Sequence, residues 1–126
     1  MVSGSQRRLD PVAVAAATRR VLHAVDDLDA LPPSAADLRL VTRALLDRLA
    51  DTAPGRSVEV RVPPYAAVQC VTGPRHTRGT PGSVVETDAL TWVRLATGRL
   101  AWPDAVAAGL VRASGERADL APYLPL

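Results

Sequence analysis

Apolar residues recur every three to four positions over most of the first half of the chain, which is the period of an amphipathic helix. Asp10 followed by Pro11 is a helix-start signal and predicts a helix over about residues 11–25. Ser34 is a second N-cap, and Pro54-Gly55 ends the helix that it starts. The buried stripe predicted for the first helix consists of Val14, Thr18, Val21, Val25 and Leu28.

The period changes to two after residue 57. Valines alternate with charged residues over residues 58–62, which predicts a strand with one face in water. Pro63-Pro64 cannot donate hydrogen bonds to a sheet and ends this strand. Further strands are predicted over about residues 65–71, 83–87 and 110–113.

Two helices are predicted between the third and fourth of these strands. Asp88 caps a helix that Gly98 ends, and a short helix runs from Pro103 to Gly109. The apolar end of the chain, residues 119–126, is expected to dock on the domain. The predicted fold class is α/β of the α+β type: a mostly antiparallel twisted sheet covered on one face by helices.

A length of 126 residues suits one domain. We expect residues 1–9 to form a flexible tail and residues 10–126 to form the domain. No apolar stretch is long enough for a transmembrane helix. Cys70 is the single cysteine, so no internal disulfide is possible, and a reducing cytoplasm is the expected location.

Charge argues against a nucleic-acid partner. The net charge is only +2, and the fifteen basic residues, all arginine, are interleaved with acidic ones. A nucleic-acid binder usually concentrates its basic residues and supplies aromatic stacking platforms, and aromatic residues make up only 3% here.

The chain carries little that resembles catalytic chemistry. Cys70 lies in a predicted strand and is interpreted as a small buried hydrophobe. His23 and His76 lie far apart in sequence and form no metal-ligand motif. An enzyme that uses His76 as a base beside Cys70 or Tyr65 is the weakest alternative, because this spacing matches no known motif. We therefore expect no cofactor, no metal and no enzymatic activity.

The loop over residues 73–82 holds the densest polar chemistry. It is rich in glycine and proline and carries Arg75, His76 and Arg78. Such a loop can turn backbone N–H groups and arginine side chains toward a carboxylate or phosphate. It lacks the Gly-Lys-Ser/Thr ending of a nucleotide-binding loop. Two interpretations stay open: an anion site, or a connection whose arginines are simply solvated.

Three stretches carry a family resemblance: VRVPPYAAVQCVTGPRHTRGT, VVETDALTWVRLATGRLAWPDAVAAGLVRASGE and ADLAPYLPL. From about residue 58 onward the chain resembles the sterol carrier protein family, in particular its small actinobacterial branch. The resemblance implies an α/β fold that often encloses an apolar tunnel for a fatty-acyl chain or a sterol, with the terminal helix near the tunnel mouth. It also implies a domain that is not an enzyme by itself.

We therefore expect a carrier for a lipid-like molecule held in an interior cavity, with an arginine of the loop 75–78 placed to meet a carboxylate head group. The expected ligand-binding residues are Val60, Val62, Val68, Leu90, Val93, Leu120, Tyr65, Arg75, His76 and Arg78. The alternative is a protein-interaction or scaffold module that uses the loop 73–82 and binds no lipid. The sequence leaves the oligomeric state open.

Overall fold

The computed structural model describes residues 8–73 and 82–126. Its helices and strands follow the predicted order closely and form an α+β fold, which confirms the predicted class. The helices are α1 (Pro11–Asp26), α2 (Ala35–Thr52), α3 (Ala89–Ala96) and α4 (Trp102–Ala107). The strands are β1 (Val58–Val62), β2 (Ala66–Cys70), β3 (Ser83–Thr87) and β4 (Val111–Ser114), and a 3₁₀ turn (Ala121–Tyr123) follows.

Three helices begin at the capping residues that the sequence predicts. The side chain of Asp10 accepts a hydrogen bond from the backbone N–H of Val12 at 3.0 Å. Ser34 Oγ accepts from the N–H of Asp37 at 3.1 Å in the same way. Asp88 Oδ1 accepts from the N–H of Thr91 at 2.8 Å. Each cap satisfies a backbone donor that the first turn of a helix leaves unpaired.

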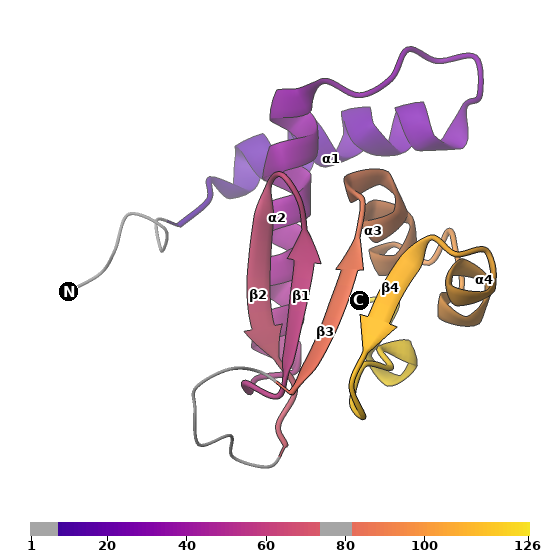
Figure 1. Ribbon diagram of the computed structural model, residues 1–126. Coiled ribbons are helices and arrows are strands. Elements are labelled where there is room, and N and C mark those ends of the chain that lie inside the picture. The colour runs from indigo at the N-terminus through magenta and orange to yellow at the C-terminus, as the bar shows by residue number, and fades with distance from the viewer. Residues whose placement is uncertain (1–7, 74–81) are drawn as a thin grey trace.

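The four strands form one open sheet in the order β2-β1-β3-β4. The pairings of β1 with β2 and of β3 with β4 are antiparallel, whereas β1 and β3 are parallel. The sheet is thus mostly antiparallel, as predicted, with one parallel pairing at its centre. Figure 1 shows the helices gathered behind one face of this sheet.

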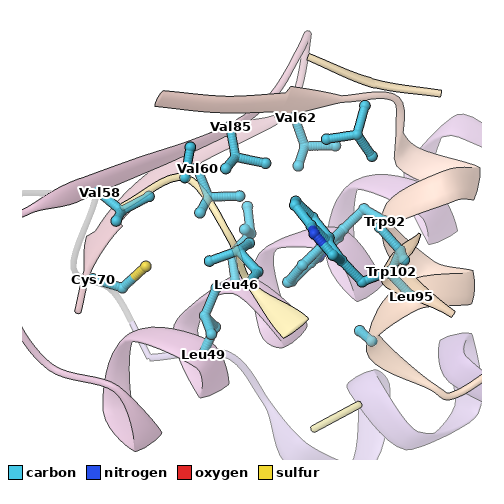
Figure 2. Close-up of a cluster of buried hydrophobic side chains, with 14 of the residues drawn as sticks. Leu46, Leu49, Val58, Val60, Val62, Cys70, Val85, Trp92, Leu95 and Trp102 are labelled. Atoms are coloured by element: carbon cyan, nitrogen blue, oxygen red, sulfur yellow. The ribbon is translucent and has the colours of Figure 1, made fainter. Parts of the chain in front are cut away.

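The main hydrophobic core lies between the sheet and the helices. Val58 and Val60 point from β1 toward Leu46 and Leu49 of α2, and Val62 lies beside Trp92 of α3 (Figure 2). The largest side chain at this seam is Trp92, whose Nε1 donates a hydrogen bond to the backbone carbonyl of Thr42 at 3.3 Å. Further buried members of the core are Cys70, Val85, Leu95, Trp102, Ala105 and Leu120.

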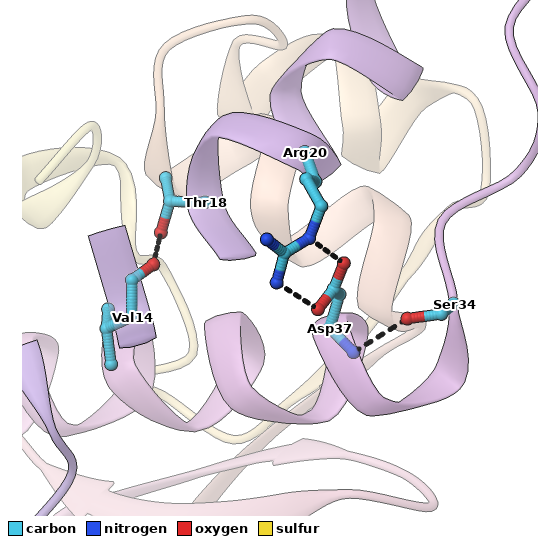
Figure 3. A network of polar contacts seen from close by, with 5 residues as sticks. All are labelled: Val14, Thr18, Arg20, Ser34 and Asp37. Carbon is cyan, nitrogen blue, oxygen red and sulfur yellow. Dashed lines mark hydrogen bonds and ion pairs between the residues drawn. The ribbon is translucent and has the colours of Figure 1, made fainter. Parts of the chain in front are cut away.

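A second, smaller cluster joins the first three helices. It consists of Ala17, Val21, Val41 and Val93. A bidentate ion pair also joins α1 to α2. Arg20 Nε and Nη2 donate hydrogen bonds to the Asp37 carboxylate at 2.7 and 2.9 Å (Figure 3). This pair is exposed and adds little stability, so the apolar cluster holds α1 in place.

The end of β2 is fixed to the end of α2 by a close backbone contact. Val71 has a φ of 66°, in the left-handed region that a β-branched residue rarely adopts. Its N–H donates to the carbonyl of Ala53 at 2.6 Å, and its own carbonyl accepts from Ser57 Oγ at 2.6 Å. A Cβ at Gly55 would lie 2.2 Å from the Val71 carbonyl carbon, so only glycine fits opposite this residue.

Candidate functional site

The structure brings together four of the six residues predicted to line an interior cavity. Val60, Val62 and Leu120 belong to the main core and are 0% exposed. Val68 is partly buried and packs against the same cluster. A side chain beside a void large enough for water would keep accessible surface toward it. The three fully buried side chains keep none, so no water-sized space adjoins them.

The other two predicted lining residues lie elsewhere. Val93 is also fully buried, but it belongs to the second cluster with Val21 and Val41. Leu90 is half-buried and is a member of neither cluster. The six predicted residues are therefore divided between the two clusters and a position outside both.

Only one of the polar residues predicted for the site lies within the described residues. Arg75, His76 and Arg78 lie outside the described residues. Tyr65 is half-buried at the turn between β1 and β2, where it packs against the main core and also lines two surface grooves.

Cys70 is buried in the main core, as the sequence predicts. Burial raises the pKa of its thiol to about 11, so the sulfur stays protonated at neutral pH. A protonated, enclosed thiol is a poor nucleophile. Within residues 8–73 and 82–126, no three His, Cys, Asp or Glu side chains gather where they could hold a metal ion.

An apolar groove of about 260 Å³ opens where the C-terminal segment crosses the connection between α3 and α4. The backbone N–H of Leu126 donates to the carbonyl of Ala96 at 2.9 Å and holds the segment in place. Gly98 turns the chain at the end of α3 with a φ of 81°, a conformation that favours glycine. The groove is lined by Leu95, Gly98, Leu100, Ala101, Trp102, Pro103, Ala121, Leu124 and Pro125.

Among the residues that the structure describes, no charged side chain lines this C-terminal groove. Trp102 forms part of its wall and retains 8% exposure, in contrast to the 1% of Trp92. The nearest ion pair in sequence is that of Arg99, whose Nε donates to Asp26 Oδ1 at 2.6 Å and so ties the turn to α1. The hydrogen bonds from Arg99 lower the pKa of the Asp26 carboxyl. The positive charge of Arg99 is therefore already paired with the Asp26 carboxylate.

Two further hollows flank the edge strand β2. One, of about 380 Å³, runs between β2 and α2, and we call it the β2-edge groove. It is lined by Arg39, Arg43, Asp47, Tyr65, Ala66, Ala67 and Val68. The other, of about 350 Å³, lies at the turn between β1 and β2 and is lined by Arg61, Pro63, Pro64, Tyr65, Ala66, Ala67 and Glu86.

A family model described as bacterial SCP ortholog matches residues 34–126, which run from the start of α2 to the end of the chain. The chain belongs to this bacterial sterol carrier protein-like family. The match confirms the family resemblance and extends it to α2, while α1 lies outside it. No curated protein matches the chain. None of the helices described for this SCP-family protein is long and apolar enough to cross a membrane.

Sequence reasoning missed both grooves as sites. It predicted that the apolar chain end would dock, but docking at the α3–α4 connection requires knowledge of the tertiary fold. The spacing of Arg39 and Arg43, one helical turn apart on the polar side of α2, was a usable signal for the β2-edge groove. That spacing alone is common on solvated helices and gains meaning only beside an edge strand.

Proposed function

We propose that this SCP-family protein is a non-catalytic binding protein for an amphipathic molecule and that the apolar chain of this ligand lies in the C-terminal groove. The observation that carries the proposal is the groove itself: an apolar hollow of about 260 Å³ whose described lining residues are all uncharged. Family membership supports a lipid-like ligand, because lipid carriage is the role associated with the fold.

The size of the groove limits the ligand. Sites for drug-sized molecules usually have volumes of about 300–1,000 Å³, and this groove is smaller. It therefore suits a short alkyl chain or one end of a longer one. Because none of the described lining residues is a cation, the polar head group of the ligand would remain in water.

Binding of the ligand between the sheet and the helices would cost more free energy than binding in the C-terminal groove. A chain placed beside Val60 and Val62 would have to displace side chains that already fill the seam. Each fully buried side chain of this size contributes about 1.5–3 kcal/mol, so separating the layers would be costly. The interior lining set and a cytoplasmic location remain predictions from the sequence.

The test is binding of decanoic acid, measured by displacement of a fluorescent fatty acid. The wild-type protein should bind it saturably. Ala121 is exposed in the groove wall, so Ala121→Trp should fill the hollow and abolish binding without unfolding the protein. Ala108→Trp is the matched control, since Ala108 is exposed at the end of α4 and outside the groove.

Native mass spectrometry of protein purified from cells provides a second measurement. A co-purified lipid that disappears in Ala121→Trp but persists in Ala108→Trp would support the groove as the site. Equal uptake by both variants would overturn the proposed site. A wild-type protein with no co-purified ligand and no fatty-acid uptake would overturn the proposed function as well.

The alternative of an interaction module built on the loop 73–82 stays a proposal of its own, since residues 74–81 are outside the described chain. Alanine substitution of Arg75 and Arg78 together, followed by a pull-down from cell extract, tests it. Retention of every partner by the double variant would remove its basis.

A further inference from the structure

The β2-edge groove carries two arginines that form no ion pair with any described carboxylate. Arg39 and Arg43 line it from α2. The ion pairs within residues 8–73 and 82–126 join Arg20 to Asp37, Arg61 to Glu59 and Arg99 to Asp26. Asp47 lies one turn beyond Arg43 and is not within ion-pair distance of it. The groove therefore presents two positive charges and one negative charge to a partner.

The opposite wall of the groove is a sheet edge. β2 is the first strand in the sheet order and pairs only with β1 in the part of the chain that the structure describes. No other described segment forms a backbone hydrogen bond with β2, so the N–H and C=O groups along its outer side can pair with another strand. Ala66 and Ala67 line this wall, and their small side chains allow a second backbone to approach.

The two walls match in spacing. α2 passes behind β1 and β2 along the length of the strands (Figure 1). Residues one helical turn apart, such as Arg39 and Arg43, have Cβ atoms about 5–6 Å apart. Alternate residues of an extended chain are about 6.6–6.8 Å apart and point to the same face. Two acidic residues at alternate positions of an added strand can therefore meet both arginines.

We propose that the β2-edge groove binds an extended acidic segment of another protein. The segment adds to the sheet beside β2 and sets two carboxylates, at alternate positions, on Arg39 and Arg43. Main-chain hydrogen bonds to the edge supply affinity, and the charged pairs supply specificity, as in other cases of strand addition. Asp47 disfavours a third acidic residue at the next alternate position.

Charge favours this occupant over a second copy of the chain. Two copies that meet edge to edge around a two-fold axis would each bring the same net positive groove to the contact. A fatty-acid carboxylate could pair with one arginine, but it would leave the backbone groups of the β2 edge without partners. An acidic extended chain satisfies both walls of the groove.

The experiment uses a fluorescein-labelled heptapeptide, Thr-Val-Glu-Val-Glu-Val-Thr, capped at both ends and followed by fluorescence anisotropy. The wild-type protein should bind it saturably and more weakly as salt increases, because exposed charge pairs are screened. The double variant Arg39→Glu/Arg43→Glu should bind about tenfold more weakly or worse, a change that corresponds to one decade in Kd.

The matched control is Arg19→Glu/Arg48→Glu. It makes the same change in net charge at two exposed arginines of α1 and α2 that lie outside the groove. This control should bind the peptide as the wild-type protein does. Circular dichroism should show both double variants folded, since the altered side chains are at the surface.

Two N-methylated peptides test strand addition directly. Methylation of the backbone nitrogens that face β2 should abolish binding, whereas methylation of the alternate nitrogens should leave it intact. Retained binding by both methylated forms would overturn the strand-addition geometry.

Four other results would overturn the proposal. The first is that the wild-type protein does not bind the parent peptide, and the second is that Arg39→Glu/Arg43→Glu binds it as the wild type does. The third is displacement of the peptide by an equal concentration of decanoic acid, which would indicate a small-carboxylate site. The fourth is light scattering that shows a homodimer dissociated by the peptide, which would assign the edge to self-association. None of these outcomes depends on ligand uptake at the C-terminal groove, so the two proposals can fail separately.

Discussion

The seam behind the sheet and the rim around it differ in how completely their side chains fill space. At the seam, Val60, Val62, Leu46 and Trp92 are essentially inaccessible, and the indole N–H already has an acceptor. At the rim, the C-terminal groove and the β2-edge groove leave hollows of about 260 and 380 Å³. The difference indicates that the seam stabilises the fold, whereas the rim is where another molecule can bind without a rearrangement.

The largest expected effect is at the seam. Trp92→Ala should lower the free energy of unfolding by about 3–5 kcal/mol, the usual cost of removing a large buried aromatic side chain. Chemical denaturation followed by circular dichroism measures it. A loss below about 1 kcal/mol would mean that the seam is loosely packed and would break the contrast with the rim.

Cys70 offers a pH test of the same sealed seam. Because the folded-state pKa of about 11 lies above the ordinary 9.0, the thiol stays protonated in the folded protein while the unfolded chain ionises. Stability should therefore be intact below pH 9 and fall between pH 9 and 11, by roughly 2–3 kcal/mol. The measurement is the unfolding free energy of the wild-type protein against Cys70→Ala at each pH. Identical pH profiles would show that the thiol is not desolvated.

At the rim, Leu124→Ala should reduce stability less than a substitution at the seam does, and it should weaken ligand binding. Leu124 is only partly buried, so about 1 kcal/mol of stability should be lost, below the 1.5–3 kcal/mol of a fully buried leucine. Because its side chain forms part of the C-terminal groove, decanoic acid should bind several-fold more weakly. A variant with reduced stability and unchanged ligand affinity would remove the groove from consideration.

The smallest expected effect concerns a polar defect at the seam. Thr42 Oγ1 is buried without a hydrogen-bond partner among the described residues. Thr42→Val has nearly the same shape and removes the unpaired hydroxyl, so it should be neutral or stabilise by up to about 1 kcal/mol. Thr91→Val is the matched control: its buried hydroxyl donates to Asp88 Oδ2 at 2.9 Å, and its loss should destabilise by about 1 kcal/mol. Thermal unfolding of both variants gives the comparison, and a destabilised Thr42→Val would indicate an unrecognised partner for its hydroxyl.

Local signals predicted most of the fold. Asp10, Ser34 and Asp88 cap their helices through contacts within three residues, and the alternation over residues 58–62 identifies the inner face of β1. Leu28 was predicted to lie on the buried stripe of the first helix, and that was wrong. The helix ends at Asp26, Asp27 turns the chain into an extended conformation, and Leu28 is 96% exposed.

The candidate sites depend on long-range packing, which local sequence patterns do not specify. Nothing local in the sequence shows that β1 pairs with β3 in parallel, which leaves β2 at the edge. The valines of β1 were correctly identified as inward-facing, but their pattern is the same whether the facing layer leaves a cavity or fills it. Trp92 closes that space from the opposite layer, and its rotamer is a property of the assembled core.

One of the two tryptophans of the chain lies at the seam and the other lies at the rim. Trp92 is enclosed with its N–H bonded to a backbone carbonyl, whereas Trp102 forms part of the wall of the C-terminal groove. The molecule thus contains its own pair of optical reporters. In a Trp92→Phe background, a shift in emission wavelength on titration with a fatty acid would originate at the groove alone. With Trp102→Phe, the remaining signal would follow denaturation and be insensitive to the same titrant.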